Sequence, residues 1–335
     1  MLRAAGVGAR GKTRMEVGNH NEVSGKPPMV RAPRHSHRMV RRGGKDAMGR
    51  IAGAVIIVVV AIIVAAAVAV IYGSMSWNRS SDASFARLLA LADTTPVTGL
   101  PTTFSREQLD SLPAPVRRYF GRVLIPSQRM IRLAYIDHEG EFALKPNQWQ
   151  RFTSRQLYTT APRGFVWDAD IHMLPFMPVR VRDRYAAGSA SMLATMAGVI
   201  KVVDQEGTPG LASGALLRFI AEAAWLPTAL LPSEGVRWSA IDDSTARATV
   251  SDAGIEVTMD VHFGAEGEIS RITAMRERDV NGTSVLTPWV GEMSRELMLV
   301  SGMKIPVSAS VKWVAPEGEH AYWRGRVRGA RFEFR

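Results

Sequence analysis

The stretch Ile255–Phe263, which reads IEVTMDVHF, shows the pattern that decides the fold of this 335-residue chain. Apolar and polar side chains alternate along it, so an extended strand would carry one apolar face and one polar face. Phe165–Ile171, Val179–Tyr185 and Ile305–Trp313 repeat the alternation, and turn signals such as Asn281-Gly282 separate the runs. The pattern predicts about ten or eleven half-buried antiparallel strands after residue 127, without the strand–helix alternation of a parallel sheet.

Near the C-terminus the alternation changes phase. Even positions hold arginines first and apolar residues afterwards: Arg324, Arg326, Arg328, Ala330, Phe332 and Phe334. A regular strand cannot keep one apolar face through such a change. A β-bulge or a strand end is therefore expected near Gly329.

One stretch between the strands departs from the period of two. Ala215–Leu226 (ALLRFIAEAAWL) is apolar nearly all round and stops before Pro227, which predicts a buried helix. Its only charges, Arg218 and Glu222, lie one helical turn apart and can pair. The two patterns together predict an α+β domain over residues 127–335, in which a strongly curved, half-barrel-like antiparallel β-meander wraps around the buried helix 215–226.

Residues 73–126 contain several sequence patterns typical of helices, and we interpret them as a helical linker region. The apolar residues of Ser84–Ala92 fall on one helical face. Ser105 followed by Gln108 has the signature of a capping box. Residues 116–123 repeat apolar side chains at helical spacing and predict a second amphipathic helix.

A membrane-spanning helix is expected over Ile51–Tyr72 (IAGAVIIVVVAIIVAAAVAVIY), which carries no charged side chain. A helix of this length reaches roughly 33 Å, enough for a hydrocarbon core of about 30 Å. A cleavable signal peptide is the alternative, but its apolar core is usually shorter, about 7–15 residues. We expect a single-pass anchor.

Positive charge is concentrated before this span. The formal net charge is +11, and residues 1–50 hold twelve Lys/Arg against three Asp/Glu. The positive-inside rule predicts a cytoplasmic N-terminus and an extracytoplasmic main domain. Residues 1–50 lack apolar periodicity and are expected to be disordered. The remainder is nearly neutral, so nucleic-acid binding is not indicated, and the absence of cysteine excludes disulfides.

Five residues are the candidates for a ligand cavity or a buried ion pair: Arg218, Glu222, Trp225, Trp167 and Asp168. In the functional interpretation, Arg218 and Glu222 line a cavity, and burial raises the pKa of Glu222 so that it can act as an acid or base. In the structural interpretation, the pair is satisfied and fixes how the helix docks. We favour the structural interpretation.

Arg180, Arg182 and Arg184 form a candidate cationic face on one strand, suited to an anionic partner. The structural alternative is a solvent-exposed strand face or a sheet edge whose charges prevent pairing with another strand. The seven histidines lack metal-ligand spacing, so neither a metal site nor another cofactor is predicted. The chain also lacks a nucleophile elbow, a P-loop and a dinucleotide-binding fingerprint.

Several segments resemble a family of uncharacterised bacterial membrane-anchored proteins, a domain of unknown function, over about residues 110 to 330. They are LPAPVRRYF (Leu112–Phe120), GFVWDADI (Gly164–Ile171), MPVRVRDRYAAG (Met177–Gly188), RFIAEAAWLPTALL (Arg218–Leu231), VRWSAIDD (Val236–Asp243), TPWVG (Thr287–Gly291) and AYWRGRV (Ala321–Val327). The resemblance implies a shared fold and no particular activity. From the apolar span and its basic flank we expect the chain to be anchored in the bacterial inner membrane. More loosely, the expected fold is similar to the half-barrels of LolA/LppX-like envelope lipid or lipoprotein carriers.

The leading hypothesis is a non-catalytic binding module for an apolar or lipid-like ligand or for an envelope partner. It predicts an apolar cavity between the helix and the sheet. One alternative is a hydrolase that uses Glu222 and Arg218, with Asp168 as a further carboxylate. Another alternative is a purely structural protein. The ligand and the oligomeric state stay open at this point.

Overall fold

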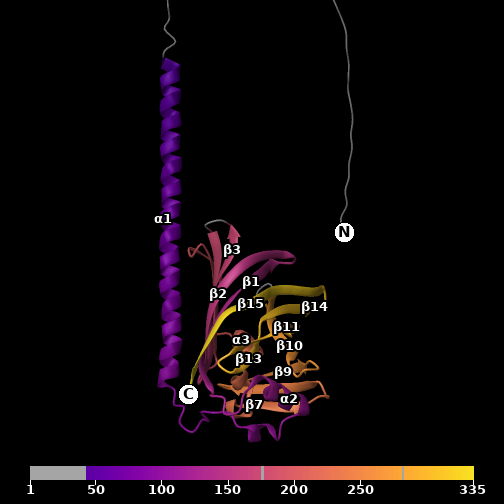
Figure 1. The fold of residues 1–335 in the computed structure, drawn as a ribbon. Helices are drawn as coiled ribbons and strands as arrows, with labels where there is room; N and C mark the ends of the chain where they lie inside the picture. Colours follow the sequence, from indigo (N-terminus) through magenta and orange to yellow (C-terminus); the bar gives the residue numbers. More distant parts are fainter. Residues whose placement is uncertain (1–42, 175–176, 281–282) are drawn as a thin grey trace, which may run out of the picture. The chain divides into compact units, whose positions relative to one another are not determined.

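The computed structural model describes residues 43–174, 177–280 and 283–335, and Figure 1 shows their ribbon. The predicted hairpin turn at Asn281-Gly282 and the tail up to residue 42 lie outside the described residues. The fold described below is that of the unit Val58–Arg335.

Helix α1 (Gly43–Thr94) is one continuous helix of 52 residues. It begins before Ile51, so residues 43–50, which were expected in the disordered tail, are helical. The separate helix predicted within residues 84–92 is its C-terminal part, because no proline or other breaker interrupts propagation between Gly73 and Ser84. Within it, Met48–Thr94 contains a window of mean hydropathy 3.5 and is long and apolar enough to cross a membrane.

Two shorter helical elements follow α1. Ser105 precedes only a short 3₁₀ helix, η1 (Arg106–Leu109), and its side chain makes no capping hydrogen bond, so the predicted capping box is wrong. Helix α2 (Ala114–Val123) matches the second amphipathic prediction and has Pro115 in its first turn. Its apolar face is buried in the main core.

The strands in chain order are β1 (Ile131–Lys145), β2 (Gln148–Thr160), β3 (Arg163–Leu174), β4 (Met177–Ala186), β5 (Ser189–Met196), β6 (Ile200–Glu206), β7 (Val236–Ala240), β8 (Thr245–Asp252), β9 (Ile255–Phe263), β10 (Ile269–Val280), β11 (Thr283–Met293), β12 (Leu297–Val300), β13 (Met303–Pro306), β14 (Ser308–Ala315) and β15 (Gly318–Phe334). The described residues thus form more strands than predicted. Strands as short as β7, β12 and β13 do not extend far enough for a period of two to show. The strand predicted over Ile305–Trp313 is divided at Pro306, which has no backbone N–H for a sheet ladder.

Thirteen of these strands form one antiparallel sheet in the order β6-β5-β4-β3-β2-β1-β15-β14-β11-β10-β9-β8-β7. Two meanders meet where β15 pairs with β1 (Figure 1). Strands β12 and β13 form a separate hairpin. The edge strands β6 and β7 are not paired with each other, so the sheet is open.

The junction between β1 and β15 contains the predicted change of phase. Asp137 pairs with Gly329 and His138 pairs with Val327, so Arg328 is the extra residue of a β-bulge. This confirms the expectation near Gly329. Farther along the junction, Gly140 approaches β15 so closely that a Cβ atom there would lie 2.1 Å from the Arg324 carbonyl oxygen.

Helix α3 (Pro209–Glu222) begins earlier than the predicted Ala215, because Thr208 caps it by accepting a hydrogen bond from the Leu211 N–H. The chain then continues through three 3₁₀ helices, η2 (Ala223–Trp225), η3 (Pro227–Leu230) and η4 (Pro232–Glu234). Helix α3 packs against β3, β4 and β5 of one meander and against β9 and β10 of the other. We call the sheet face that contacts α3 the inner face and the opposite face the outer face.

Candidate functional site

A buried ion cluster joins α3 to the inner face of the sheet. Arg218 Nε donates to Glu222 Oε1 at 2.8 Å, and its Nη1 donates to Asp183 Oδ2 at 2.7 Å. The guanidinium also lies between two aromatic rings, 4.9 Å from the centroids of both Phe165 and Trp167. Arg218 therefore binds two carboxylates and two rings that come from three different elements.

The second carboxylate oxygen of Glu222 is also engaged. Gln156 Nε2 and the Tyr158 hydroxyl both donate to Glu222 Oε2 at 2.9 Å. Burial raises the pKa of Asp183, which Arg218 partly offsets, and burial also raises the pKa of Tyr158. With each charge paired and each carboxylate hydrogen-bonded, the cluster has the geometry of a docking contact for α3.

His138 lies beside this cluster without sharing its hydrogen bonds. Its ring centroid is 4.7 Å from that of Trp225 and 5.9 Å from that of Trp323. Within the described part of the chain, neither ring nitrogen has a hydrogen-bond partner. Burial lowers the pKa of His138 to about 4, so the ring is neutral near pH 7.

The space between α3 and the sheet is filled by side chains. Trp167 and Trp225 are both buried, and Trp225 Nε1 donates to the Pro306 carbonyl at 3.0 Å. A small cavity of about 10 Å³ lies beside Tyr119, Ala224 and Ile269 and has room for about one water molecule. Neither this cavity nor the larger one described next is the apolar cavity predicted between helix and sheet.

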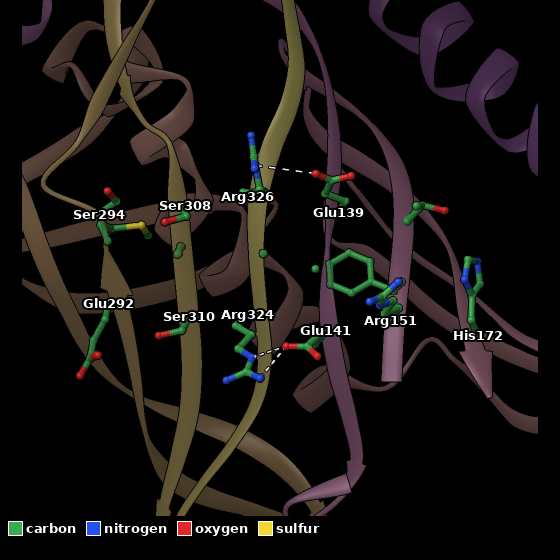
Figure 2. A pocket seen from close by; sticks show the side chains of 16 residues that line it. Glu139, Glu141, Arg151, His172, Glu292, Ser294, Ser308, Ser310, Arg324 and Arg326 are labelled. Carbon is green, nitrogen blue, oxygen red and sulfur yellow. Dashed lines mark hydrogen bonds and ion pairs between the residues drawn. The ribbon is translucent and has the colours of Figure 1, made fainter. Parts of the chain in front are cut away.

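The larger cavity is an open trough of about 890 Å³ on the outer face, shown in Figure 2. Strands β1, β2, β3, β11, β14 and β15 supply its walls. We call it the outer trough, and its lining consists of Glu139, Gly140, Glu141, Arg151, Phe152, Thr153, His172, Glu292, Met293, Ser294, Ser308, Ala309, Ser310, Arg324, Gly325 and Arg326. Eleven of these residues carry charged, imidazole or hydroxyl side chains, but more of the exposed lining surface is apolar than polar.

Ion pairs cross the trough floor between β1 and β15. Arg324 Nε donates to Glu141 Oε2 at 2.8 Å, and Arg326 lies 3.7 Å from Glu139 (Figure 2). The Arg324 guanidinium also stacks over Trp149, 4.3 Å from the ring centroid. The Arg326 and Glu139 side chains are 66% and 42% exposed, so this pair is weak and open to competition from a ligand.

The trough walls carry further polar groups. Arg151 on β2 is exposed, and its guanidinium has no ion-pair partner among the residues that the structure describes. His172 on β3 lies on the same side of the trough, whereas Ser294, Ser308 and Ser310 line the opposite side (Figure 2). The trough thus offers a cation, an imidazole and hydroxyl groups around a paired floor.

The row Arg180, Arg182 and Arg184 is not an open cationic face, because α1 covers much of it. Arg182 is only 7% exposed, donates to Ser80 and Ser81 at 2.8 and 2.9 Å, and stacks over Trp77. These contacts turn the predicted binding row into part of a helix-docking surface.

The other two arginines of the row, Arg180 and Arg184, also bind partners within the chain. Arg180 donates to the Ser74 carbonyl and to Asn78 Oδ1, and it pairs with Asp170 at 3.0 Å. Arg184 donates to Ser191 at 2.7 Å. Each member of the row therefore has a partner within the chain.

Asp168 lies on the outer face, away from Glu222. It accepts hydrogen bonds from Trp77 Nε1 at 2.9 Å and from Arg155 at 3.1 Å. Trp167, its neighbour in β3, points to the inner face and contacts Arg218. Because successive strand residues face opposite ways, Asp168 cannot act with Glu222, and that predicted combination is wrong.

Sequence reasoning missed the outer trough. Glu139 and Glu141 share a strand face, as do Arg324 and Arg326, and this i, i+2 spacing was the available signal. What the spacing does not reveal is that the two pairs become neighbours across β1 and β15. Among the described residues, no group of three or more His, Cys, Asp or Glu side chains could hold a metal ion.

Comparison with known proteins leaves the activity open. None of the curated proteins matches the chain. The crystal structure of a LolA superfamily protein from Nitrosomonas europaea matches 67% of this chain and 94% of its own, with 10% sequence identity and a TM-score of 0.35. A likeness this low carries no argument about fold or function. A family model described as a family of unknown function, DUF6920, matches residues 110–332, and the chain therefore belongs to that family.

Proposed function

We propose that this protein is a membrane-anchored, non-catalytic binding module that holds a polar envelope partner in the outer trough. The trough itself carries the proposal. Its volume of about 890 Å³ falls within the range of about 300–1,000 Å³ for ligand sites. Its lining combines Arg151, which has no ion-pair partner among the described residues, with exposed ion pairs that a partner's charges can replace.

The charged side chains of the lining are the reason for proposing a polar partner rather than a purely apolar or lipid-like ligand. Three carboxylates and three guanidinium groups line the trough, together with several hydroxyl groups. An acyl chain placed there would desolvate those charges without pairing them, which is costly. The inner face offers an apolar ligand little space, because Leu216, Phe219 and Ile220 of α3 are at most 1% exposed.

Helix α1 supports the membrane anchor. It is long and apolar enough to span a bilayer, and the basic residues of the tail precede the span. By the positive-inside rule, the N-terminus lies in the cytoplasm and the sheet lies outside the bacterial inner membrane. The contacts of α3 with strands of both meanders support a sheet that curves as a half-barrel around this helix.

The alternative of a hydrolase at Glu222 and Arg218 has little geometric support. A general acid or base must reach a substrate, whereas both oxygens of Glu222 are hydrogen-bonded to Arg218, Gln156 and Tyr158. Neither residue lines the outer trough.

The proposal can be tested by the accessibility of a single thiol in the trough, because the chain has no cysteine. The full-length Ser310→Cys variant is labelled with a maleimide in detergent, in pure lipid vesicles and in membranes of its own source cell. A bound partner should slow labelling only in the source membranes. Arg324→Glu in the same chain should restore the rate, because it breaks the floor pair with Glu141.

Ser270→Cys is the matched control, since Ser270 is also a partly exposed strand serine but lies outside the trough lining. Its labelling should be alike in all three settings. Equal labelling of Ser310→Cys in vesicles and source membranes would contradict the proposal. Slow labelling in pure vesicles would indicate that lipid, and not a partner, covers the trough.

A further inference from the structure

The end of the apolar span is held tightly against the β5–β6 turn. Gly73 directly follows Tyr72, and a Cβ atom at Gly73 would lie 2.6 Å from Val199 Cγ2 and 3.0 Å from the Ala197 carbonyl oxygen. Gly198, at a φ of +72°, faces Gly73 so closely that its own Cβ would lie 2.6 Å from the Gly73 carbonyl carbon. Only glycine at these positions permits this contact.

Hydrogen bonds place the first residues of β4 next to this turn. The Ala197 N–H donates to the Pro178 carbonyl at 2.8 Å. Arg180, two residues further along β4, donates to the Ser74 carbonyl at 3.2 Å. The start of β4 and the β5–β6 turn are therefore both adjacent to the point where the apolar part of α1 ends.

Exposed apolar side chains lie at the end of β3, at the start of β4 and around the β5–β6 turn. Their exposed fractions are 39% for Met173, 38% for Met177, 49% for Val199, 59% for Ile200 and 51% for Val202. We call these five residues the lip. A contiguous patch of exposed apolar residues on a protein surface indicates a site that binds a membrane or another protein.

We propose that the lip contacts the outer surface of the bilayer, beside the point where α1 leaves it. This placement of the lip rests on the proposed membrane anchor. Helix α1 would fix the depth of Gly73 relative to the bilayer, and the close packing of Gly73 on Gly198 then fixes the depth of the lip. Tyr72, which is exposed at the same end of the span, suits the interface between acyl chains and headgroups. The lip is thus continuous with the membrane-facing surface of α1.

The lip lies next to one end of the outer trough. His172 lines the trough, and Met173 of the lip is the next residue in β3. A lip that rests on lipid holds this end of the trough at the membrane surface. The trough would then receive the membrane-proximal part of its partner.

Fluorescence quenching in vesicles tests the proposal with the full chain. Ile200→Cys, Ile62→Cys and Leu299→Cys carry an environment-sensitive dye and are reconstituted in phosphatidylcholine and phosphatidylglycerol vesicles that contain a nitroxide lipid. The three native side chains are similarly exposed, at 59%, 63% and 69%. Ile62 reports on the span, and Leu299, on the separate hairpin β12–β13, is the control for a site away from lipid.

The expected result is loss of fluorescence at Ile200→Cys and Ile62→Cys, with little loss at Leu299→Cys. Quenching of Ile62→Cys alone would overturn the lip while leaving the anchor in place. Absence of quenching at Ile62→Cys would overturn the anchor and the lip together. Because all three positions are exposed, the dye should not disturb the fold, which circular dichroism of the labelled chains checks.

Discussion

The charged residues on the two faces of β2 and β3 differ in burial and in pairing. On the inner face, Gln156 and Tyr158 complete a cluster in which Arg218, Glu222 and Asp183 are mutually satisfied and largely withdrawn from water. On the outer face, the same strands present Arg151 and His172 to an open trough. Charges that are buried and paired fix a structure, whereas charges that stay wet and loosely paired can exchange partners.

The largest expected effect comes from breaking the inner cluster. Arg218→Met leaves two carboxylates buried without their cation, which should lower the free energy of unfolding by about 3–5 kcal/mol. Arg247→Met is the matched control, because Arg247 pairs with Asp260 on the surface and is 51% exposed. The Arg247→Met variant should lose far less stability than Arg218→Met, because water screens the exposed pair. Urea unfolding measures both, and equal losses would show that the inner cluster has no special role.

Removing Trp77 should loosen α1 from the outer face. Trp77 is 5% exposed, stacks on Arg182 and donates to Asp168, so Trp77→Ala removes a buried aromatic ring and leaves both partners exposed to water. We expect the free energy that holds α1 to the sheet to fall by about 3 kcal/mol. Amide exchange across residues 77–92 measures this opening. Tyr72→Ala, at an exposed position, should leave the exchange unchanged.

The inner face should also make stability depend on pH. Burial lowers the pKa of His138 to about 4, whereas the unfolded chain keeps a value of about 6.5. Between these values, the unfolded state binds more protons, so this residue lowers stability as pH falls through the window and has no effect above it. The loss should reach about 2 kcal/mol near pH 5 relative to neutral pH.

His138→Phe isolates that contribution, because phenylalanine keeps a ring between Trp225 and Trp323 but cannot titrate. Unfolding of both proteins is measured at neutral pH and near pH 5. The variant should show a smaller pH dependence than the parent protein. The same dependence in both would mean that His138 does not stay neutral in the folded chain.

The smallest effect on stability is expected in the outer trough. Arg324→Ala removes an ion pair whose side chains are 52% and 38% exposed, so the unfolding free energy should change by less than about 1 kcal/mol. The same change should abolish the slow labelling of Ser310→Cys in source membranes. A large loss of stability would instead assign the floor pair a structural role.

Much of this fold could be predicted from periodicity alone. Strand β9 has the bounds Ile255–Phe263 read from its alternation. Helix α3 contains the predicted run only from Ala215 to Glu222, because the chain continues as the 3₁₀ helix η2 before Leu226. Both patterns are local, and each follows from the burial of one surface. The bulge at Arg328 was also predictable, because a change of phase within one strand has few other solutions.

The outer trough and the docking of α1 could not be found this way. Glu141 and Arg324 are 183 residues apart, and their contact depends on the register between β1 and β15. The arginine row on β4 likewise appeared open, because its partners Ser80 and Ser81 lie in a distant helix. A strand's own pattern shows which face is polar but does not show what lies across from it.

Amide hydrogen exchange compares the two faces most directly. The full chain is placed in lipid discs, once taken from its source membranes with bound partners and once purified and reconstituted in lipid alone. The account predicts that partners slow exchange in residues 139–141, 308–310 and 324–326, which line the outer trough, and leave α3 unchanged. Slower exchange in α3 and the inner face, without change in the trough, would contradict it.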